Sequence, residues 1–175
     1  MSSHQNNLWT EAGWKVRHHL YLYNLFFNKE IQIQDNKKVV GCIKLAEKHF
    51  EKIVSIDKEI FDPFWRSSSL TLLDTLESCN ETMLYEYQDR GKLLAYALVG
   101  VTMRSSFLQR FAVHPETQRL GIGSLLLENI LSDMVKRKMI SMKLNTQKEN
   151  FAAQKLYEKN GFSLSKESLS IMSSD

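Results

Sequence analysis

The sequence predicts a mixed α/β fold in which a sheet carries helices on both of its faces. Some runs alternate apolar and polar residues, as half-buried strands do, while others repeat apolar residues every three or four positions, as amphipathic helices do. These two kinds of run follow one another along the chain, with a tight hairpin turn between two of the strands. The 175 residues suit one domain, alone or with an appendage, and 43% of them are hydrophobic, which allows a substantial core.

The first part of the chain is the least regular. Residues 1–36 are expected to form an N-terminal extension, followed by a main domain over residues 37–175. Alternation over residues 14–23 favours a strand, although residues 20–27 are apolar enough for a helix. The polar run at residues 34–38 is the best candidate for the boundary between the two parts.

The extension shows a weak sequence similarity to another part of the chain. Residues 12–16 resemble residues 160–164, and chance is the alternative explanation. The extension could therefore supply an extra strand or be the remnant of a duplicated domain. The aromatic-rich residues 8–27 could also form a contact in an oligomer.

The elements of the main domain follow from the same patterns. The apolar stripe that begins at Ile122 has three- and four-residue spacing and predicts an amphipathic helix. Asp89-Arg90-Gly91 predicts a hairpin turn with its glycine in the left-handed conformation. Strands are predicted at residues 39–45, 82–88, 92–103, 107–113, 140–146 and, as one or two strands, 162–171; helices are predicted at residues 47–61, 70–76, 122–135 and 151–160.

The stretch of residues 111–127 is the best candidate for a binding site. A strand reaches Val113 and then ends, because Pro115 has no N–H to donate and restricts the residue before it. Gly121 and Gly123 open the next helix. At such a helix start several backbone N–H groups lack partners and the helix dipole is positive, so the sequence predicts a site for a phosphate or pyrophosphate.

The residues around this glycine pair restrict the kind of ligand. Arg119 adds a fixed positive charge. The pair lacks the third glycine of a dinucleotide fingerprint and the Gly-Lys-Ser/Thr of a phosphate loop. A second motif follows the next strand and contains Asn150, Tyr157 and, at its end, Gly161-Phe162.

Together, the two motifs resemble those of the GNAT superfamily of N-acetyltransferases. The first is the sequence from Gln118 to Gly123, after a strand that ends in Val-His-Pro, and the second runs from Asn150 to Phe162. The resemblance is specific over residues 107–162 and extends in architecture over about residues 40–172. It implies a GNAT-type sheet that is mostly antiparallel and splayed at its centre.

The resemblance also implies that acetyl-CoA is the co-substrate and that backbone groups hold it. In the family, the strand before the turn pairs with the pantetheine arm, amides of the turn and helix start hold the pyrophosphate, and an asparagine near the later helix helps to orient the cofactor. In this chain these residues are Phe111, Ala112 and Val113; Gln118, Arg119, Leu120, Gly121, Ile122, Gly123 and Ser124; and Asn150.

The implied reaction is the direct attack of an unprotonated primary amine on the acetyl carbonyl in a ternary complex. Tyr157 is expected to protonate the departing CoA thiolate, and the Val113 N–H to stabilise the oxyanion. Tyr157 could instead be a core aromatic residue, and Asn150 a simple helix N-cap. The alternative function is a non-catalytic acyl-CoA-binding or protein-interaction module on the same scaffold.

The sequence does not present an evident general base. N-terminal acetyltransferases of ribosomal proteins carry a glutamate where this chain has Asn145, and asparagine cannot accept a proton at neutral pH. This difference weakens, without excluding, a protein N-terminus as the substrate. A water molecule, Glu59 or Glu86 could take this role. His114 lies at a strand end before a proline and is expected to be a surface residue.

The acceptor amine is expected to meet the loop between the first two helices of the main domain. Phe61, Phe64 and Trp65 lie there, and loops often carry function. These aromatic residues favour an apolar or extended acceptor, such as a peptide end, over a highly cationic sugar. The alternative is that they form a hydrophobic plug between the helices.

Composition restricts the partners further. The net charge of +3 is too small to indicate a nucleic acid. Cys42 and Cys79 cannot build a disulfide framework, and no closely spaced set of Cys and His suggests a metal. No apolar run approaches the roughly twenty residues of a membrane span, and residues 1–7 lack a signal-peptide core. We therefore expect a cytoplasmic enzyme that acts on a small-molecule or peptide amine without metal, nucleic acid or membrane.

Overall fold

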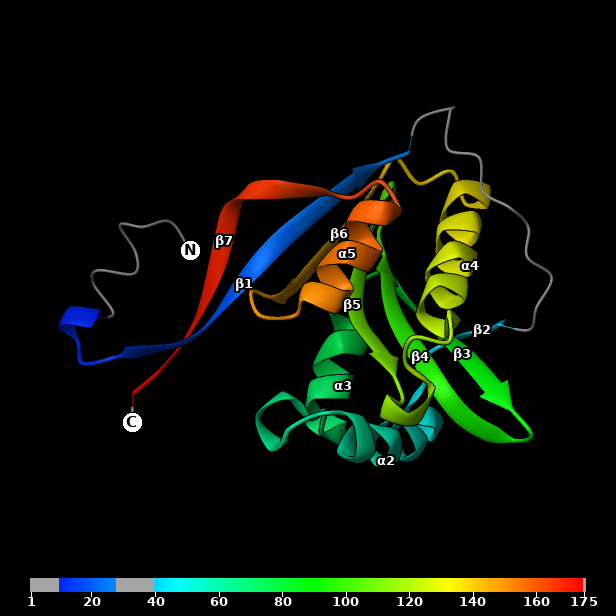
Figure 1. Ribbon diagram of the computed structural model, residues 1–175, viewed down its shortest axis with the longest axis horizontal. Coiled ribbons are helices and arrows are strands. Elements are labelled where there is room, and N and C mark those ends of the chain that lie inside the picture. Colours follow the sequence, from blue (N-terminus) through cyan, green and yellow to red (C-terminus); the bar gives the residue numbers. More distant parts are fainter. Residues whose placement is uncertain (1–9, 28–39, 175) are drawn as a thin grey trace. The chain divides into compact units, whose positions relative to one another are not determined.

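The computed structural model describes residues 10–27 and 40–174, and the mixed α/β class is confirmed there by seven strands and four α-helices (Figure 1). The described residues between 27 and 142 form a larger compact unit, and the described residues before and after this range form a smaller one. The strand pairings given below for each unit are antiparallel, in agreement with the mostly antiparallel sheet expected from the sequence.

Four strands of the larger unit are neighbours in the order β2-β3-β4-β5. Their bounds are Val40–Lys44 for β2, Glu81–Asp89 for β3, Lys92–Val101 for β4 and Ser105–Val113 for β5. The turn between β3 and β4 has two left-handed residues, Arg90 with φ of 48° and Gly91 with φ of 80°. The predicted hairpin with a left-handed glycine is therefore confirmed.

Helices cover both faces of these strands (Figure 1). On one face lie α2 (Phe50–Ile60), preceded by the short 3-10 turn η1 (Glu47–His49), and α3 (Ser69–Glu77), preceded by η2 (Pro63–Trp65). On the other face lies α4 (Ile122–Lys136), which contacts β3, β4 and β5.

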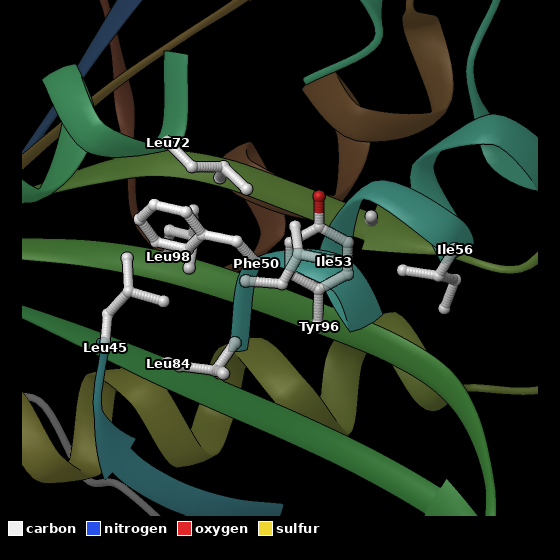
Figure 2. Close-up of a cluster of buried hydrophobic side chains, with 9 residues drawn as sticks. Leu45, Phe50, Ile53, Ile56, Leu72, Leu84, Tyr96 and Leu98 are labelled. Atoms are coloured by element: carbon white, nitrogen blue, oxygen red, sulfur yellow. The ribbon is translucent and has the colours of Figure 1, made fainter. Parts of the chain in front are cut away.

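Successive side chains of β3 point to opposite faces of the sheet. Leu84 packs in the cluster of buried apolar side chains under α2 and α3. Its neighbour Tyr85 points the other way and donates a hydrogen bond to Asp133 of α4 at 2.5 Å. Figure 2 shows the cluster beneath α2 and α3, whose buried members are Leu45, Phe50, Ile53, Ile56, Leu72, Leu84, Tyr96, Leu98 and Ala112.

The smaller unit contains β1 (Lys15–Phe26), β7 (Ser163–Ser173) and α5 (Phe151–Lys159), together with β6 (Ser141–Gln147) from Lys143 onward, in the neighbour order β6-β1-β7. β1 pairs with β7 in an antiparallel ladder, so a strand and not a helix forms over residues 20–26. Leu20, Tyr23 and Leu25 of β1 are buried. These residues therefore belong to the core of the smaller unit.

Some expectations concern residues that the structure does not describe. The polar run 34–38 lies outside the described residues, and the division of the chain at residue 36 stays a prediction. Within the described ranges, none of the helices is long and apolar enough to cross a membrane. The same ranges contain no group of three or more His, Cys, Asp or Glu side chains that could hold a metal ion.

Candidate functional site

The backbone N–H and C=O groups at the end of β5 point in two directions, toward β4 in some residues and away from it in others. His114 donates its N–H to the carbonyl oxygen of Leu94 at 2.8 Å, which places it and Ala112 at positions that bond to β4. Because backbone direction alternates along a strand, Phe111 and Val113 direct their N–H and C=O groups away from β4. The Val113 carbonyl oxygen accepts a hydrogen bond from Gln118 Nε2 at 3.2 Å on that edge.

The turn after β5 brings the chain into α4 through left-handed backbone. After the short turn η3 (Pro115–Thr117), Arg119 has φ of 63° and Gly121, the N-cap of α4, has φ of 82°. The first helical hydrogen bond runs from Leu125 N to Gly121 O at 3.0 Å. The N–H groups of residues 122–124 therefore lie in the first turn, where they have no acceptor within the helix.

The charge around this helix start favours an anion. The first turn of α4 contains no acidic residue, so no carboxylate of that turn competes for its N–H groups. Arg119 is exposed beside it. A Cβ added to Gly121 would meet no atom within 4 Å, so the space next to this backbone is open. The predicted residues from Gln118 to Ser124 thus form one continuous turn and helix start in the structure.

His114 is buried, and its expected surface position is wrong. Only 7% of the residue is exposed, because α2 covers the end of β5. The His114 Nε2 lies 3.2 Å from Glu59 Oε2, and its Nδ1 accepts a 3.4 Å hydrogen bond from the Glu116 N–H. Of the two carboxylates considered as bases, Glu59 is thus engaged with His114, and Glu86 forms an ion pair of 2.8 Å with Lys52.

A buried polar network under α2 was not predicted from the sequence. Asp57 of α2 is fully buried and forms an ion pair with Arg110 of β5. Its carboxylate also accepts hydrogen bonds from the Tyr96 hydroxyl and, at 2.8 Å, from the Ser67 N–H. Burial raises the pKa of Tyr96, so this hydroxyl stays protonated. The one available signal was an aspartate at a core-facing position of α2, four residues after Ile53.

This network fastens the loop between α2 and α3 to β5. Arg110 donates a hydrogen bond to the Trp65 carbonyl oxygen at 2.7 Å, and its guanidinium lies 4.1 Å from the centre of the Phe61 ring. Such stacking of a cation on an aromatic face is attractive. The loop is therefore tied to the strand that precedes the helix start of α4.

The three aromatic residues of this loop take different places. Phe61 stacks on Arg110, whereas Phe64 and Trp65 pack edge to face, with ring centres 5.0 Å apart. Phe64 and Trp65 line a cavity of about 190 Å³ and Phe61 does not. The residues lining this cavity are Phe64, Trp65, Arg66, Ser67, Thr71, Leu72, Thr75, Leu98, Gln109 and Arg110.

The second motif forms α5 of the smaller unit. The Asn150 side chain caps this helix by accepting a hydrogen bond from the Ala153 N–H at 3.1 Å, which confirms the expected N-cap. Gly161 has φ of 85° and follows Asn160, the C-cap of α5. Asn145 is exposed on β6. Tyr157 is 4% exposed in this unit's core.

Tyr157 is surrounded by aromatic rings. Its ring centre lies 6.2 Å from that of Tyr23 and 5.8 Å from that of Phe162. Burial raises the pKa of the Tyr157 hydroxyl above its usual value. The phenol is therefore protonated at neutral pH and can serve as a proton donor but not as a base.

The strand, glycine turn and helix define an α/β protein in which the first N–H groups of α4 have no acceptor within the helix. Residues 50–162 match the acetyltransferase (GNAT) family, and the chain belongs to this family. The resemblance found in the two sequence motifs is thereby confirmed.

Among curated proteins, the chain is similar to the ribosomal protein bS18-alanine N-acetyltransferase of Escherichia coli strain K12. The two are 35% identical over 78 residues, which cover 45% of this chain and 53% of that protein. The chain thus spans about half the length of this curated relative.

Solved structures show the same fold. The ribosomal-protein-S18-alanine N-acetyltransferase from Escherichia coli has a TM-score of 0.62 and 25% identity, covering 71% of this chain and 78% of that one. The PaiA N-acetyltransferase from Thermoplasma acidophilum, solved in complex with coenzyme A, has a TM-score of 0.61 and 18% identity, covering 74% and 92%.

Proposed function

We propose that this chain is an N-acetyltransferase that transfers the acetyl group of acetyl-CoA to the α-amine of a peptide or protein. The observation that carries the proposal is the start of α4. Its first N–H groups have no acceptor within the helix, no acidic residue lies in its first turn, and Arg119 stands beside it. These features suit the pyrophosphate of coenzyme A.

The backbone edge of β5 that faces away from β4 supports a position for the pantetheine arm and acetyl group of acetyl-CoA. Phe111 and Val113 direct their N–H and C=O groups away from β4, as an extended pantetheine arm requires for strand-like pairing. The Val113 N–H is the proposed donor to the oxyanion that forms on the acetyl carbonyl. A backbone N–H suits this role because the strand fixes its direction before the reaction begins.

The proposed chemistry is a direct transfer. The unprotonated amine forms a C–N bond with the acetyl carbonyl carbon, and the C–S bond to coenzyme A then breaks. The leaving thiolate takes the proton of the Tyr157 hydroxyl, and the proton lost by the acetylated nitrogen restores the phenol through solvent. The phenol is protonated at neutral pH and therefore holds the proton that the thiolate needs, although burial, which raises its pKa, makes it a weaker acid.

An α-amine is the favoured acceptor for two reasons. The curated relative is named for the acetylation of a protein's alanine. In addition, an α-amine with a pKa near 8 keeps about a tenth of its molecules unprotonated at pH 7, against well under about a thousandth for a lysine side chain, and this offsets the lack of a glutamate at Asn145, which by itself counts against a protein N-terminus. A site without an evident general base therefore suits an α-amine better than a lysine side chain.

Acetyl-CoA affinity tests the proposal. We expect Gly121→Val to weaken acetyl-CoA binding about tenfold or more, because a side chain there occupies the space beside the helix start. Gly91→Val is the matched control, since Gly91 has the same left-handed conformation in the β3–β4 turn. Calorimetric titration measures both. Equal acetyl-CoA affinities for the two variants would show that the pyrophosphate does not bind at this turn.

A further inference from the structure

We propose that His114 is a positioning residue for acetyl-CoA, because its neutral imidazole shapes the turn between the β5 edge and the start of α4. This inference rests on the proposed function and names the side chain that orients the two parts of the acetyl-CoA site. His114 is buried, and its N–H, C=O, Nδ1 and Nε2 groups all have hydrogen-bond partners. The side chain is therefore held in place before any ligand binds.

His114 stands between the two backbone segments proposed to hold acetyl-CoA. Val113, on one side, directs its N–H and C=O groups away from β4, towards the proposed pantetheine arm. Gln118, on the other side, is the first residue of the proposed pyrophosphate turn. The Gln118 Nε2 donates a hydrogen bond to the Val113 carbonyl oxygen at 3.2 Å, so the two segments meet across η3. The path of η3 therefore decides how the two segments lie relative to each other.

The backbone groups of His114 hold both ends of η3. Its N–H donates to the Leu94 carbonyl oxygen at 2.8 Å, which keeps the residue paired with β4. Its carbonyl oxygen accepts hydrogen bonds from the Thr117 N–H at 2.9 Å and from the Thr117 hydroxyl at 3.0 Å. Every residue except proline offers the same N–H and C=O groups. Substitutions at position 114 thus test the imidazole alone.

The hydrogen bonds of the imidazole identify its tautomer. The Nδ1 accepts a hydrogen bond from the Glu116 N–H at 3.4 Å, as the side chain of a helix N-cap does, and so it carries no proton. The proton of the neutral ring is then on Nε2, which donates a hydrogen bond to Glu59 Oε2 of α2 at 3.2 Å. Glu59 thereby holds the ring in the tautomer that the turn requires.

The charged groups around the ring show why the neutral form matters. Glu59 faces Nε2, and the Glu116 carboxylate lies 3.7 Å from Nδ1. Glu116 also forms an ion pair of 3.6 Å with Lys92 of β4, and both of these side chains are exposed. A proton on Nδ1 would remove the acceptor of the Glu116 N–H and direct the ring towards the Glu116 carboxylate. The neutral imidazole is therefore the form that shapes η3.

Asparagine and leucine separate the two contacts of the imidazole. An asparagine side chain accepts a hydrogen bond from the backbone N–H two residues further on, as Nδ1 does from Glu116, but it ends before the position of Nε2. Leucine is apolar and replaces neither contact. His49 provides a matched control, because its Nδ1 accepts a hydrogen bond from the Ala46 N–H at 3.0 Å in the separate turn η1.

The test measures acetyl-CoA binding, catalysis and folding in four proteins: the wild type, His114→Leu, His114→Asn and His49→Leu. Calorimetric titration gives the Kd of acetyl-CoA, and acetyl transfer to a peptide with an N-terminal alanine gives kcat and the KM of acetyl-CoA. Unfolding in urea gives the stability of each protein. Nitrogen-15 NMR correlation spectra show which imidazole nitrogen carries the proton, and the signals missing in His114→Asn belong to His114.

We expect His114→Leu to weaken acetyl-CoA binding about three- to tenfold, as the loss of one hydrogen bond implies. The KM of acetyl-CoA should rise by the same factor, while kcat at saturating acetyl-CoA stays within about twofold of the wild type. His114→Asn should bind acetyl-CoA as tightly as the wild type, although it loses the contact with Glu59 and some stability. His49→Leu should lose stability and keep its acetyl-CoA affinity. The wild-type His114 ring should carry its proton on Nε2 at neutral pH.

The proposal is overturned by an unchanged acetyl-CoA affinity in His114→Leu, by an equal loss of affinity in His114→Asn or His49→Leu, or by a proton on Nδ1 of His114 at neutral pH. The failure of the proposed function looks different. The wild type then binds acetyl-CoA but acetylates no amine, and the Kd values of the variants still decide the role of His114. A wild type that binds no acetyl-CoA would overturn both the proposed function and this role.

Discussion

The buried ion pair between Arg110 and Asp57 predicts a large loss of stability in the variant Arg110→Met. Asp57 is fully buried, and the side chain of Arg110 is 19% exposed. Removing one partner of a buried pair costs about 3–5 kcal/mol, because the remaining charge is uncompensated. The Asp57 carboxylate retains hydrogen bonds from Tyr96 and Ser67, so we expect a loss at the lower end, about 3 kcal/mol.

Equilibrium unfolding in urea measures this loss as a decrease in the free energy of unfolding. The matched control is Arg104→Met, which makes the same change at an exposed arginine and should alter stability by no more than about 0.5 kcal/mol. A double variant that also carries Asp57→Leu should recover part of the loss, because no charge then remains buried while the Tyr96 hydroxyl and the Ser67 N–H lose their acceptor. A loss of less than about 1 kcal/mol in Arg110→Met, the value of an exposed pair, would refute the reasoning.

Three further variants test other parts of the structure. Tyr157→Phe should lower kcat about a hundredfold with nearly unchanged acetyl-CoA affinity, while Tyr23→Phe, the same change on the neighbouring ring, keeps kcat; lost affinity with retained kcat would assign Tyr157 to packing. Burial, with a contribution from the hydrogen bond to Glu158, raises the pKa of Tyr23 to about 12. The folded state therefore favours the neutral phenol, and this stabilisation is complete below pH about 10 and is lost as the pH rises towards about 12. Melting curves should accordingly show a smaller alkaline loss for Tyr23→Phe than for the wild type, and an equal or larger loss would contradict this. Gly100→Ala should cost about 1–3 kcal/mol in urea unfolding, because its Cβ overlaps Cys79, whereas Gly41→Ala meets its nearest atom only at 3.9 Å and serves as control; equal losses would show that the space at Gly100 is not restricted.

Local patterns were sufficient to predict most elements of this fold. The stripe after Ile122 forms α4, the Arg90-Gly91 turn joins two strands, and Asn150 caps α5, because each depends on residues close together in the sequence. The same reasoning left residues 20–27 undecided between strand and helix. Their partner β7 lies about 140 residues further along the chain, and only that pairing selects the strand.

The features that shape the candidate site depend on contacts between distant residues. Asp57 and Arg110 are separated by 53 positions, and nothing in either local pattern identifies the other as its partner. The burial of His114 likewise depends on Glu59, 55 positions earlier. A β-bulge at Gln109 arises from the register between β5 and β4, which alternation alone does not reveal.

The transfer of an acetyl group to an α-amine is the central claim, and one measurement tests it most directly. The protein is incubated with acetyl-CoA and a peptide that has an N-terminal alanine and an internal lysine, and fragmentation mass spectrometry locates any added acetyl group. We predict acetylation of the α-nitrogen alone, with kcat/KM rising with pH up to the pKa of the α-amine, near 8. Acetylation confined to the lysine, or none at all while acetyl-CoA binds, would contradict the account.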